Sequence, residues 1–101
     1  MHDLKNTKYE VHYTTLFKKQ YKKCLKQGKN KEMFLNILGI LANGEKLEAK
    51  YQDHFLLDSK YFKNCRECYI TPDWLLVYKY LENELILLLV QTGSYSEVLD
   101  L

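Results

Sequence analysis

The segment that decides the fold reads CRECYITPDWLLVYKY and spans residues 65–80. Its two halves, Cys65–Ile70 and Trp74–Tyr80, are rich in β-branched and aromatic residues, which favour strands. Between them, Thr71-Pro72-Asp73 holds the only proline of the chain, and the fixed φ of proline suits a turn. We therefore predict two antiparallel strands joined at Pro72.

The strand pattern continues on both sides of this hairpin. Glu82-Asn83 is a plausible hairpin tip, and residues 84–91 are nearly all apolar, as expected of a central strand covered on both faces. Further upstream, residues 8–13 alternate loosely and predict a first strand, and a short strand is expected near residues 54–56. After Gly93, the tail at residues 94–101 is expected to form one helical turn.

Two helices are predicted between the first strand and the rest of the sheet. Thr14 and Thr15 are candidate N-caps of a helix that runs to about Gln27 and stops at Gly28. Asn30 can cap a second helix that ends near Ala42. In both segments apolar side chains recur at helical spacing, and the short loop between them favours an antiparallel helix pair.

These elements predict the fold class α+β. We expect an antiparallel sheet of about four to five strands, with the N-terminal helical hairpin packed on one face and the other face free for a ligand. The 101 residues suit a single domain, residues 1–101, and the composition is ordinary for a globular protein, with 47% apolar and 28% charged residues.

No segment of the sequence is typical of export or membrane insertion. The N-terminus lacks the apolar stretch of a signal peptide, and the longest apolar run, Leu85–Val90, is far too short to span a bilayer. An odd number of cysteines, three, argues against a secreted disulfide framework. We expect a cytoplasmic protein that makes no contact with membranes.

Cys65 and Cys68 match the C-x-x-C spacing of some metal sites, but we do not expect a metal here. A second pair of cysteines or histidines is missing, and on a strand the two thiols point to opposite faces. We predict a packed Cys68 and a partly exposed Cys65.

The charge is unevenly distributed along the chain. Residues 1–31 hold nine lysines against two acidic residues, a net charge of +7, whereas residues 32–101 carry a net charge of −5. Two interpretations stay open: a solvated helix face, or a surface that meets a polyanion. The lysines in question lie on the first predicted helix and are Lys18, Lys19, Lys22, Lys23 and Lys26.

Four short segments carry a family resemblance. They are Tyr51–His54, Arg66–Ile70, Pro72–Tyr78 and Thr92–Tyr95. Their residues and spacing resemble those of the YafQ-like branch of the RelE family of bacterial toxins. The resemblance runs from about residue 17 to residue 99, and its most specific part is residues 66–78.

The resemblance implies a RelE-like fold and a defined activity. It implies the toxin of a type II toxin–antitoxin system that cleaves mRNA, typically on the ribosome, without a metal or other cofactor. In such a reaction the 2′-hydroxyl attacks the adjacent phosphorus and the 5′-oxygen leaves, with acid–base catalysis. The implied partners are a cognate antitoxin, mRNA and ribosomal RNA, with operator DNA reached only through the antitoxin.

Two other functions stay open on the same fold. ParE-like relatives bind DNA gyrase and carry no nuclease site. A decayed toxin would only bind its antitoxin.

Three residues of the matched segments are candidates for catalysis and base binding. His54 matches the family histidine, and an imidazole is naturally suited to act as a base at neutral pH. Asp73 could orient His54 or accept a proton itself, and Trp74 could stack a base or support the pocket. The structural alternatives are a loop histidine that caps a turn, ordinary turn chemistry for an aspartate after proline, and a tryptophan that fills the core.

Two positions depart from the family pattern. Tyr69 and Tyr95 stand where the YafQ-like proteins have histidines. The second of those histidines often serves as the leaving-group acid in the family, and a tyrosine with its proton can donate but is a poor base. Tyr95 is therefore a candidate acid, and Tyr69 a candidate catalytic residue beside it.

The remaining candidate residues are expected to bind phosphate groups of RNA. Arg66, the only arginine, presents a planar fork suited to phosphate oxygens, although on a regular strand it faces away from Tyr69. Alternatively it forms a surface ion pair with Glu67, Glu82 or Glu84. The five lysines of the first helix would contact ribosomal RNA phosphates as point charges, in a salt-dependent manner.

Overall fold

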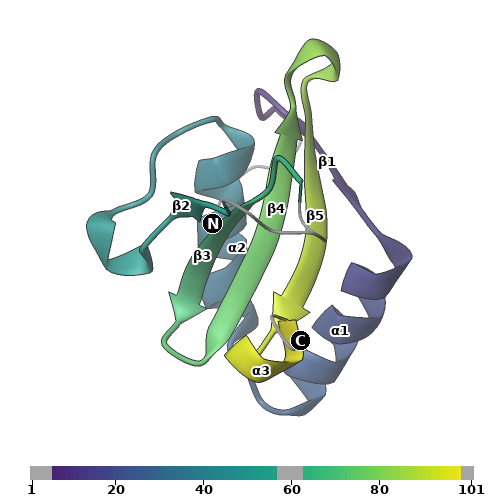
Figure 1. The fold of residues 1–101 in the computed structure, drawn as a ribbon, viewed down its shortest axis with the longest axis vertical. Helices are drawn as coiled ribbons and strands as arrows, with labels where there is room; N and C mark the ends of the chain where they lie inside the picture. The colour runs from purple at the N-terminus through teal and green to yellow at the C-terminus, as the bar shows by residue number, and fades with distance from the viewer. Residues whose placement is uncertain (1–5, 57–62, 99–101) are drawn as a thin grey trace.

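The computed structural model describes residues 6–56 and 63–98 of the chain. Within these ranges two helices follow the first strand and the rest of the sheet follows the helices (Figure 1). The elements are β1 (Glu10–Tyr13), α1 (Thr15–Lys26), α2 (Lys31–Ala42), η1 (Ala49–Tyr51), β2 (His54–Phe55), β3 (Arg66–Thr71), β4 (Trp74–Leu81), η2 (Glu82–Glu84), β5 (Ile86–Gly93) and α3 (Tyr95–Val98). The α+β class predicted from the sequence is confirmed.

The five strands lie in the order β1-β5-β4-β3-β2. β2 through β5 are antiparallel to their neighbours, whereas β1 pairs with β5 in parallel, with Val11 opposite Leu87. The sheet is therefore mixed, and the prediction of a wholly antiparallel sheet is wrong for β1. The physical reason is that residues 14–85, which hold both helices and three strands, separate β1 from β5, so no hairpin turn imposes an antiparallel pairing.

The ends of the helices follow from side-chain capping. The hydroxyl of Thr14 accepts a hydrogen bond of 2.9 Å from the backbone N–H of Phe17, so Thr14 is the cap of α1. The side chain of Asn30 accepts from the backbone at the start of α2, as predicted. Gly28, with φ of +87°, turns the chain between the helices in a conformation that glycine adopts without strain.

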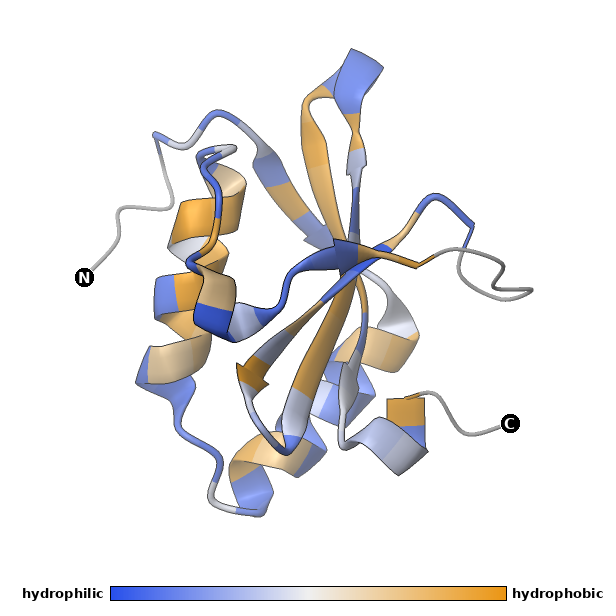
Figure 2. Ribbon diagram, turned by 60° about the vertical axis from the view of Figure 1, so that its left-hand side comes forward, coloured by the Kyte–Doolittle hydropathy of each residue, from blue (hydrophilic) through white to orange (hydrophobic). Residues whose placement is uncertain are grey.

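The main core lies between the sheet and the helices α1 and α2, which cover the same face (Figure 1). Phe34 of α2 contacts the rings of Phe17, Tyr21 and Trp74, which joins both helices to the sheet. Hydrophobic residues run along β4 and β5 and the inner side of α2, whereas the η2 tip is hydrophilic (Figure 2). In the part of the chain that the structure describes, no helix is long and apolar enough to cross a bilayer.

A smaller cluster forms on the opposite face, where Val98 of α3 packs with Cys65 and Val77. The prediction of a partly exposed Cys65 is wrong, because α3 covers this area and only 2% of the residue is exposed. Cys68 is fully buried in the main core, as predicted. The second face is therefore free for a ligand only beyond α3.

One further prediction needs correction, at β5, whereas the expected helical turn in the tail is confirmed. β5 lies between two strands, but residues 86, 88 and 90 are only half-buried, so it is not covered on both faces. The middle strand is β4, whose first five residues are all buried. The expected helical turn in the tail is α3, and residues 99–101 lie outside the described part of the chain.

Candidate active site

His54 stands on the edge of the sheet with its ring held in one orientation. β2 pairs with β3 so that His54 lies opposite Glu67, and 48% of the His54 side chain is exposed. The ring Nδ1 lies 2.6 Å from the carbonyl oxygen of Gln52. Because a carbonyl only accepts, Nδ1 carries a proton in this contact, and Nε2 is left to exchange a proton with a ligand.

The carbonyl that holds His54 comes from a strained residue. Gln52 ends η1 with φ of 49°, in the left-handed region that costs an L-residue about 1 kcal/mol. The strain turns the backbone between η1 and β2 so that its carbonyl faces the imidazole two residues later. Such strain is typical of functional sites.

Glu67 is the buried partner of the imidazole. Its Oε1 lies 3.4 Å from Nε2 of His54, and only 2% of its side chain is exposed. Its other oxygen, Oε2, has no hydrogen-bond partner among the described residues. Burial raises the pKa of the Glu67 carboxyl, and the nearby His54 opposes this effect in part. A buried carboxyl group therefore lies within ion-pair distance of an accessible imidazole.

Two phenols extend this group along the same face. Tyr69 follows Glu67 by two residues on β3, so both side chains leave the strand on the same side. Burial raises the pKa of Tyr69, and Glu67 and Tyr95 raise it further, which indicates that the three groups are close enough to interact. Tyr95, the first residue of α3, is 61% exposed and presents its ring to solvent.

The arginine of the predicted site lies on the other face. Arg66 precedes Glu67 on β3 and donates to the carboxylate of Asp53 from Nε at 3.4 Å and from a terminal nitrogen at 3.3 Å. The buried hydroxyl of Tyr78 donates to the same carboxylate at 2.5 Å. Arg66 is thus an ion-pair residue, as the alternative interpretation held, but its partner is Asp53 instead of Glu67, Glu82 or Glu84. Contact of Arg66 with RNA stays a prediction that this geometry does not favour.

Asp73 and Trp74 are not part of the group around His54. Asp73 accepts a hydrogen bond of 2.6 Å from Thr71 and lies 3.4 Å from the ammonium of Lys29, and these contacts lower its pKa. The role of orienting His54 belongs to Gln52 and Glu67 instead. Trp74 is fully buried and donates from its indole to Thr92, so the prediction that it stacks on a base is wrong. The turn at Pro72 directs the Trp74 side chain into the core, against Phe34.

The predicted basic surface exists on α1. Lys18, Lys19, Lys22, Lys23 and Lys26 are all exposed. Lys23 forms an ion pair of 2.8 Å with Glu97, which ties α1 to α3 and lowers the pKa of Glu97 to about 2. A solvated face and a polyanion contact both fit this exposure.

Sequence reasoning missed Glu67 and Gln52. The alternation that separates Arg66 from Tyr69 also places Glu67 beside Tyr69, so strand parity was a usable signal for the carboxylate. The Gln52 contact gave no such signal, because it is made by a backbone carbonyl.

Comparisons with known proteins show the family of this chain. The family model described as the bacterial toxin of the type II toxin–antitoxin system, YafQ, matches residues 9–100. The chain belongs to the YafQ family of toxins. A YafQ-family relative, the mRNA interferase toxin YafQ of Escherichia coli strain B / BL21-DE3, is 30% identical over 88 residues, which are 86% of this chain and 91% of that protein.

Solved structures of YafQ-like toxins have the same fold. A metal-bound toxin from Helicobacter pylori superposes with a TM-score of 0.80 at 36% identity, covering 87% of this chain and 96% of that one. The DinJ–YafQ complex of E. coli gives a TM-score of 0.79 at 28% identity, covering 89% and 97%.

Proposed function

We propose that this chain is the toxin of a type II toxin–antitoxin pair and cleaves mRNA with His54 as its general base. The observation that supports this most directly is the half-exposed imidazole held between the Gln52 carbonyl and the buried Glu67. Membership of the YafQ family supports the substrate, since the curated relatives are mRNA interferases. The E. coli complex with DinJ supports a cognate antitoxin as the partner of this chain too.

The chemistry is a transesterification within the RNA backbone. Nε2 of His54 takes the proton of a 2′-hydroxyl while the 2′-oxygen bonds to the adjacent phosphorus and the bond to the 5′-oxygen breaks. The products are a 2′,3′-cyclic phosphate and a 5′-hydroxyl. The imidazolium formed is stabilised by the Glu67 carboxylate 3.4 Å away. Tyr95, or Tyr69 beside it, gives its proton to the departing 5′-oxygen.

A metal has no part in this proposal. The toxin from Helicobacter pylori is metal-bound in its crystal structure. Among the described residues there is no group of three or more histidine, cysteine, aspartate or glutamate side chains able to hold an ion. His54 and Glu67 alone supply two donors, too few for a resident metal.

The basic helix supplies the attraction to RNA in this proposal. The five lysines of α1 would meet the phosphates of ribosomal RNA, and cleavage would take place on the ribosome in the cytoplasm. Lysines act as point charges, so this contact orients the toxin without reading sequence.

The test compares His54→Ala with the matched control His12→Ala. His12 lies on β1 and is exposed, with Glu10 as its partner. Wild type and H12A should arrest growth and give transcripts ending in 2′,3′-cyclic phosphates, whereas H54A should cleave about a hundredfold or more slowly. Arrest with intact transcripts and stalled replication would support a gyrase-directed toxin instead, and no arrest by wild type would leave antitoxin binding alone.

A further inference from the structure

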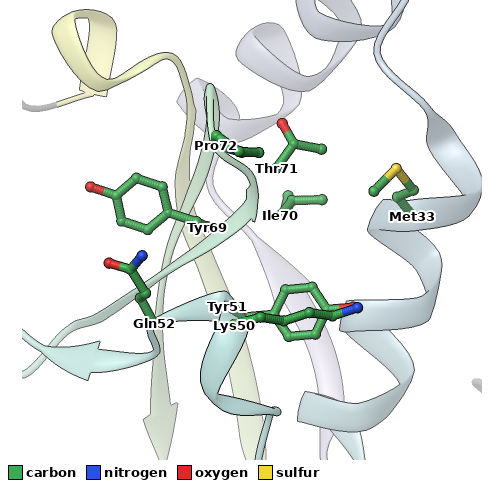
Figure 3. A pocket seen from close by; sticks show the side chains of 8 residues that line it. All are labelled: Met33, Lys50, Tyr51, Gln52, Tyr69, Ile70, Thr71 and Pro72. Atoms are coloured by element: carbon green, nitrogen blue, oxygen red, sulfur yellow. The ribbon is translucent and has the colours of Figure 1, made fainter.

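A groove opens beside the candidate active site, at the outer edge of β3. β2 pairs only with Arg66 and Glu67, so from residue 68 onward no strand of the described sheet covers this edge. The end of η1 and the start of α2 flank it instead and leave a cavity of about 530 Å³ (Figure 3). The lining residues that matter here are Met33, Lys50, Tyr51, Gln52, Tyr69 and Pro72.

The groove is continuous with the catalytic group. Tyr69, whose pKa responds to Glu67 and Tyr95, also lines the groove. Gln52 lines it as well, and its backbone carbonyl holds the ring of His54. In Figure 3, Tyr69 and Gln52 lie together at one side of the cavity and Met33 lies at the other. A ligand that reacts at His54 therefore extends naturally into this space.

The lining has the chemistry of a nucleotide site. Met33 is 41% exposed although it is a large apolar residue, and the ring of Tyr51 is half-buried beneath the ammonium of Lys50, 5.1 Å from its centroid. Pro72 adds a further apolar surface. None of the described residues that line the cavity is acidic. A flat apolar surface suits a nucleotide base, and one cation suits its phosphate. An acidic lining would repel the phosphate.

We propose that this groove binds the base of a nucleotide adjacent to the scissile phosphate. The base stacks against Tyr51 and Met33, Lys50 binds the neighbouring phosphate, and the Gln52 amide faces the base edge. This inference rests on the proposed function, because it assigns a subsite to the same RNA substrate. It also supplies the stacking surface that the buried Trp74 cannot provide.

The two methionines of the chain make a direct test possible. Since they are Met1 and Met33, ¹³C-methyl methionine labelling gives a single signal from the groove, and labelled histidine reports on His54 in the same sample. The probes are 2′-O-methyl tetranucleotides of each base, which bind but lack the attacking hydroxyl. We expect saturable shifts of both Met33 and His54, because a stacked base exerts a ring current on the methyl group.

Variants locate the contact. Lys50→Gln should weaken binding several-fold and reduce its dependence on salt, with the fold unchanged because Lys50 is exposed. Tyr51→Ala should weaken binding about tenfold and abolish the Met33 shift, since stacking on one aromatic ring is worth roughly that much. Tyr13→Ala removes a more exposed ring on β1, which does not line the groove, and should change neither.

The outcomes separate this inference from the proposed function. If the oligonucleotides shift His54 but leave Met33 unchanged, the groove assignment is overturned and the nuclease proposal stands. If neither signal shifts at any RNA concentration, both fail. If a peptide from the antitoxin shifts Met33 and RNA does not, the groove is a protein-binding edge and the inference is overturned.

Discussion

The imidazole Nε2 of His54 lies 3.4 Å from Oε1 of Glu67, a carboxylate with only 2% of its side chain exposed. Glu67 therefore lies beside the ring nitrogen that would take the proton, where it can stabilise positive charge on the imidazole without itself meeting solvent. This relationship links catalysis to stability, because an ionised carboxylate with one unpartnered oxygen is costly to bury.

Glu67→Gln should make the protein more stable and less active at neutral pH. Burial raises the pKa of Glu67 in the folded state, so the folded state binds the proton more readily than the unfolded one. The stability that depends on this proton is present at acidic pH and is lost as the pH rises through the folded pKa. Glutamine does not titrate, so the variant keeps its stability as the pH rises. It also lacks the negative charge that supports the His54 imidazolium, so cleavage should fall about tenfold or more.

Thermal melts of wild type and Glu67→Gln from pH 4 to pH 8 check this prediction. The melting temperature of the variant should exceed that of wild type most at pH 8, and the difference should shrink toward acidic pH. A difference that stays constant from pH 4 to pH 8 would contradict a raised pKa of Glu67 in the folded protein.

Tyr95→Phe and Tyr69→Phe should separate the two phenols. Tyr95 is 61% exposed and can reach a leaving oxygen, whereas Tyr69 is half-buried, so we predict that Tyr95 is the proton donor. Y95F should slow cleavage of ordinary RNA about a hundredfold, and Y69F less than tenfold.

A substrate with sulfur in place of the 5′-bridging oxygen tests the assignment, because a thiolate leaves without protonation. The defect of Y95F should nearly vanish with this substrate. An equal defect with both substrates would show that Tyr95 acts in binding and not as the acid.

Trp74→Phe should cost stability and leave catalysis intact. The variant loses the indole hydrogen bond to Thr92 and some packing against Phe34, a loss of about 1–3 kcal/mol in the free energy of unfolding. Cleavage per folded molecule, measured below the transition, should stay within about twofold of wild type. If fully folded W74F lost affinity for RNA, Trp74 would take part in base stacking, in contradiction to its burial.

Arg66→Ala and Asp53→Ala should be strongly non-additive in stability. The two side chains form an ion pair, so removing either one removes the energy of that pair, and Asp53→Ala also removes the acceptor of the Tyr78 hydroxyl. The coupling free energy from a double-mutant cycle should be about 0.5–3 kcal/mol. An Arg66→Ala variant that loses RNA affinity even when Asp53 is already alanine would give Arg66 a phosphate contact of its own.

The lysines of α1 should differ in their effect on salt-dependent RNA binding. Each phosphate contact that is lost should reduce the slope of log affinity against log salt by about 0.7 for single-stranded RNA. Lys19→Gln or Lys22→Gln should show this change, whereas Lys23→Gln should show less, because among the five in the described structure Lys23 is the one paired with an acidic residue, Glu97. Slopes unchanged in all variants would leave the helix face as solvated surface.

Local chemistry made most of the fold predictable. Asn30 caps α2 and Gly28 follows the end of α1, because capping and left-handed turns are decided by neighbouring residues. The hairpin around Pro72 follows from strand propensity and turn chemistry for the same reason. The parallel pairing of β1 was not accessible in this way, because nothing within residues 10–13 specifies a partner more than seventy residues away.

The candidate site was predictable only in part. His54 was identified because a motif and the acid–base properties of imidazole coincide. For Trp74 the sequence left a core role and a stacking role open, because a tryptophan suits both, and the packing against Phe34 decides for the core. Glu67 was overlooked as a neighbour of Arg66 in sequence, although strand parity assigns the two to opposite faces.

The parallel pairing of β1 with β5 has a consequence for when the protein becomes harmful. The backbone partners of residues 10–13 are residues 86–89, so during synthesis the first strand must wait until nearly all of the sheet has left the ribosome. The helix α1 waits as well, since its core side chains pack near the same late strand. The nascent chain therefore completes its fold only late in translation. A partner that is synthesised earlier can then already be present when the toxin first folds.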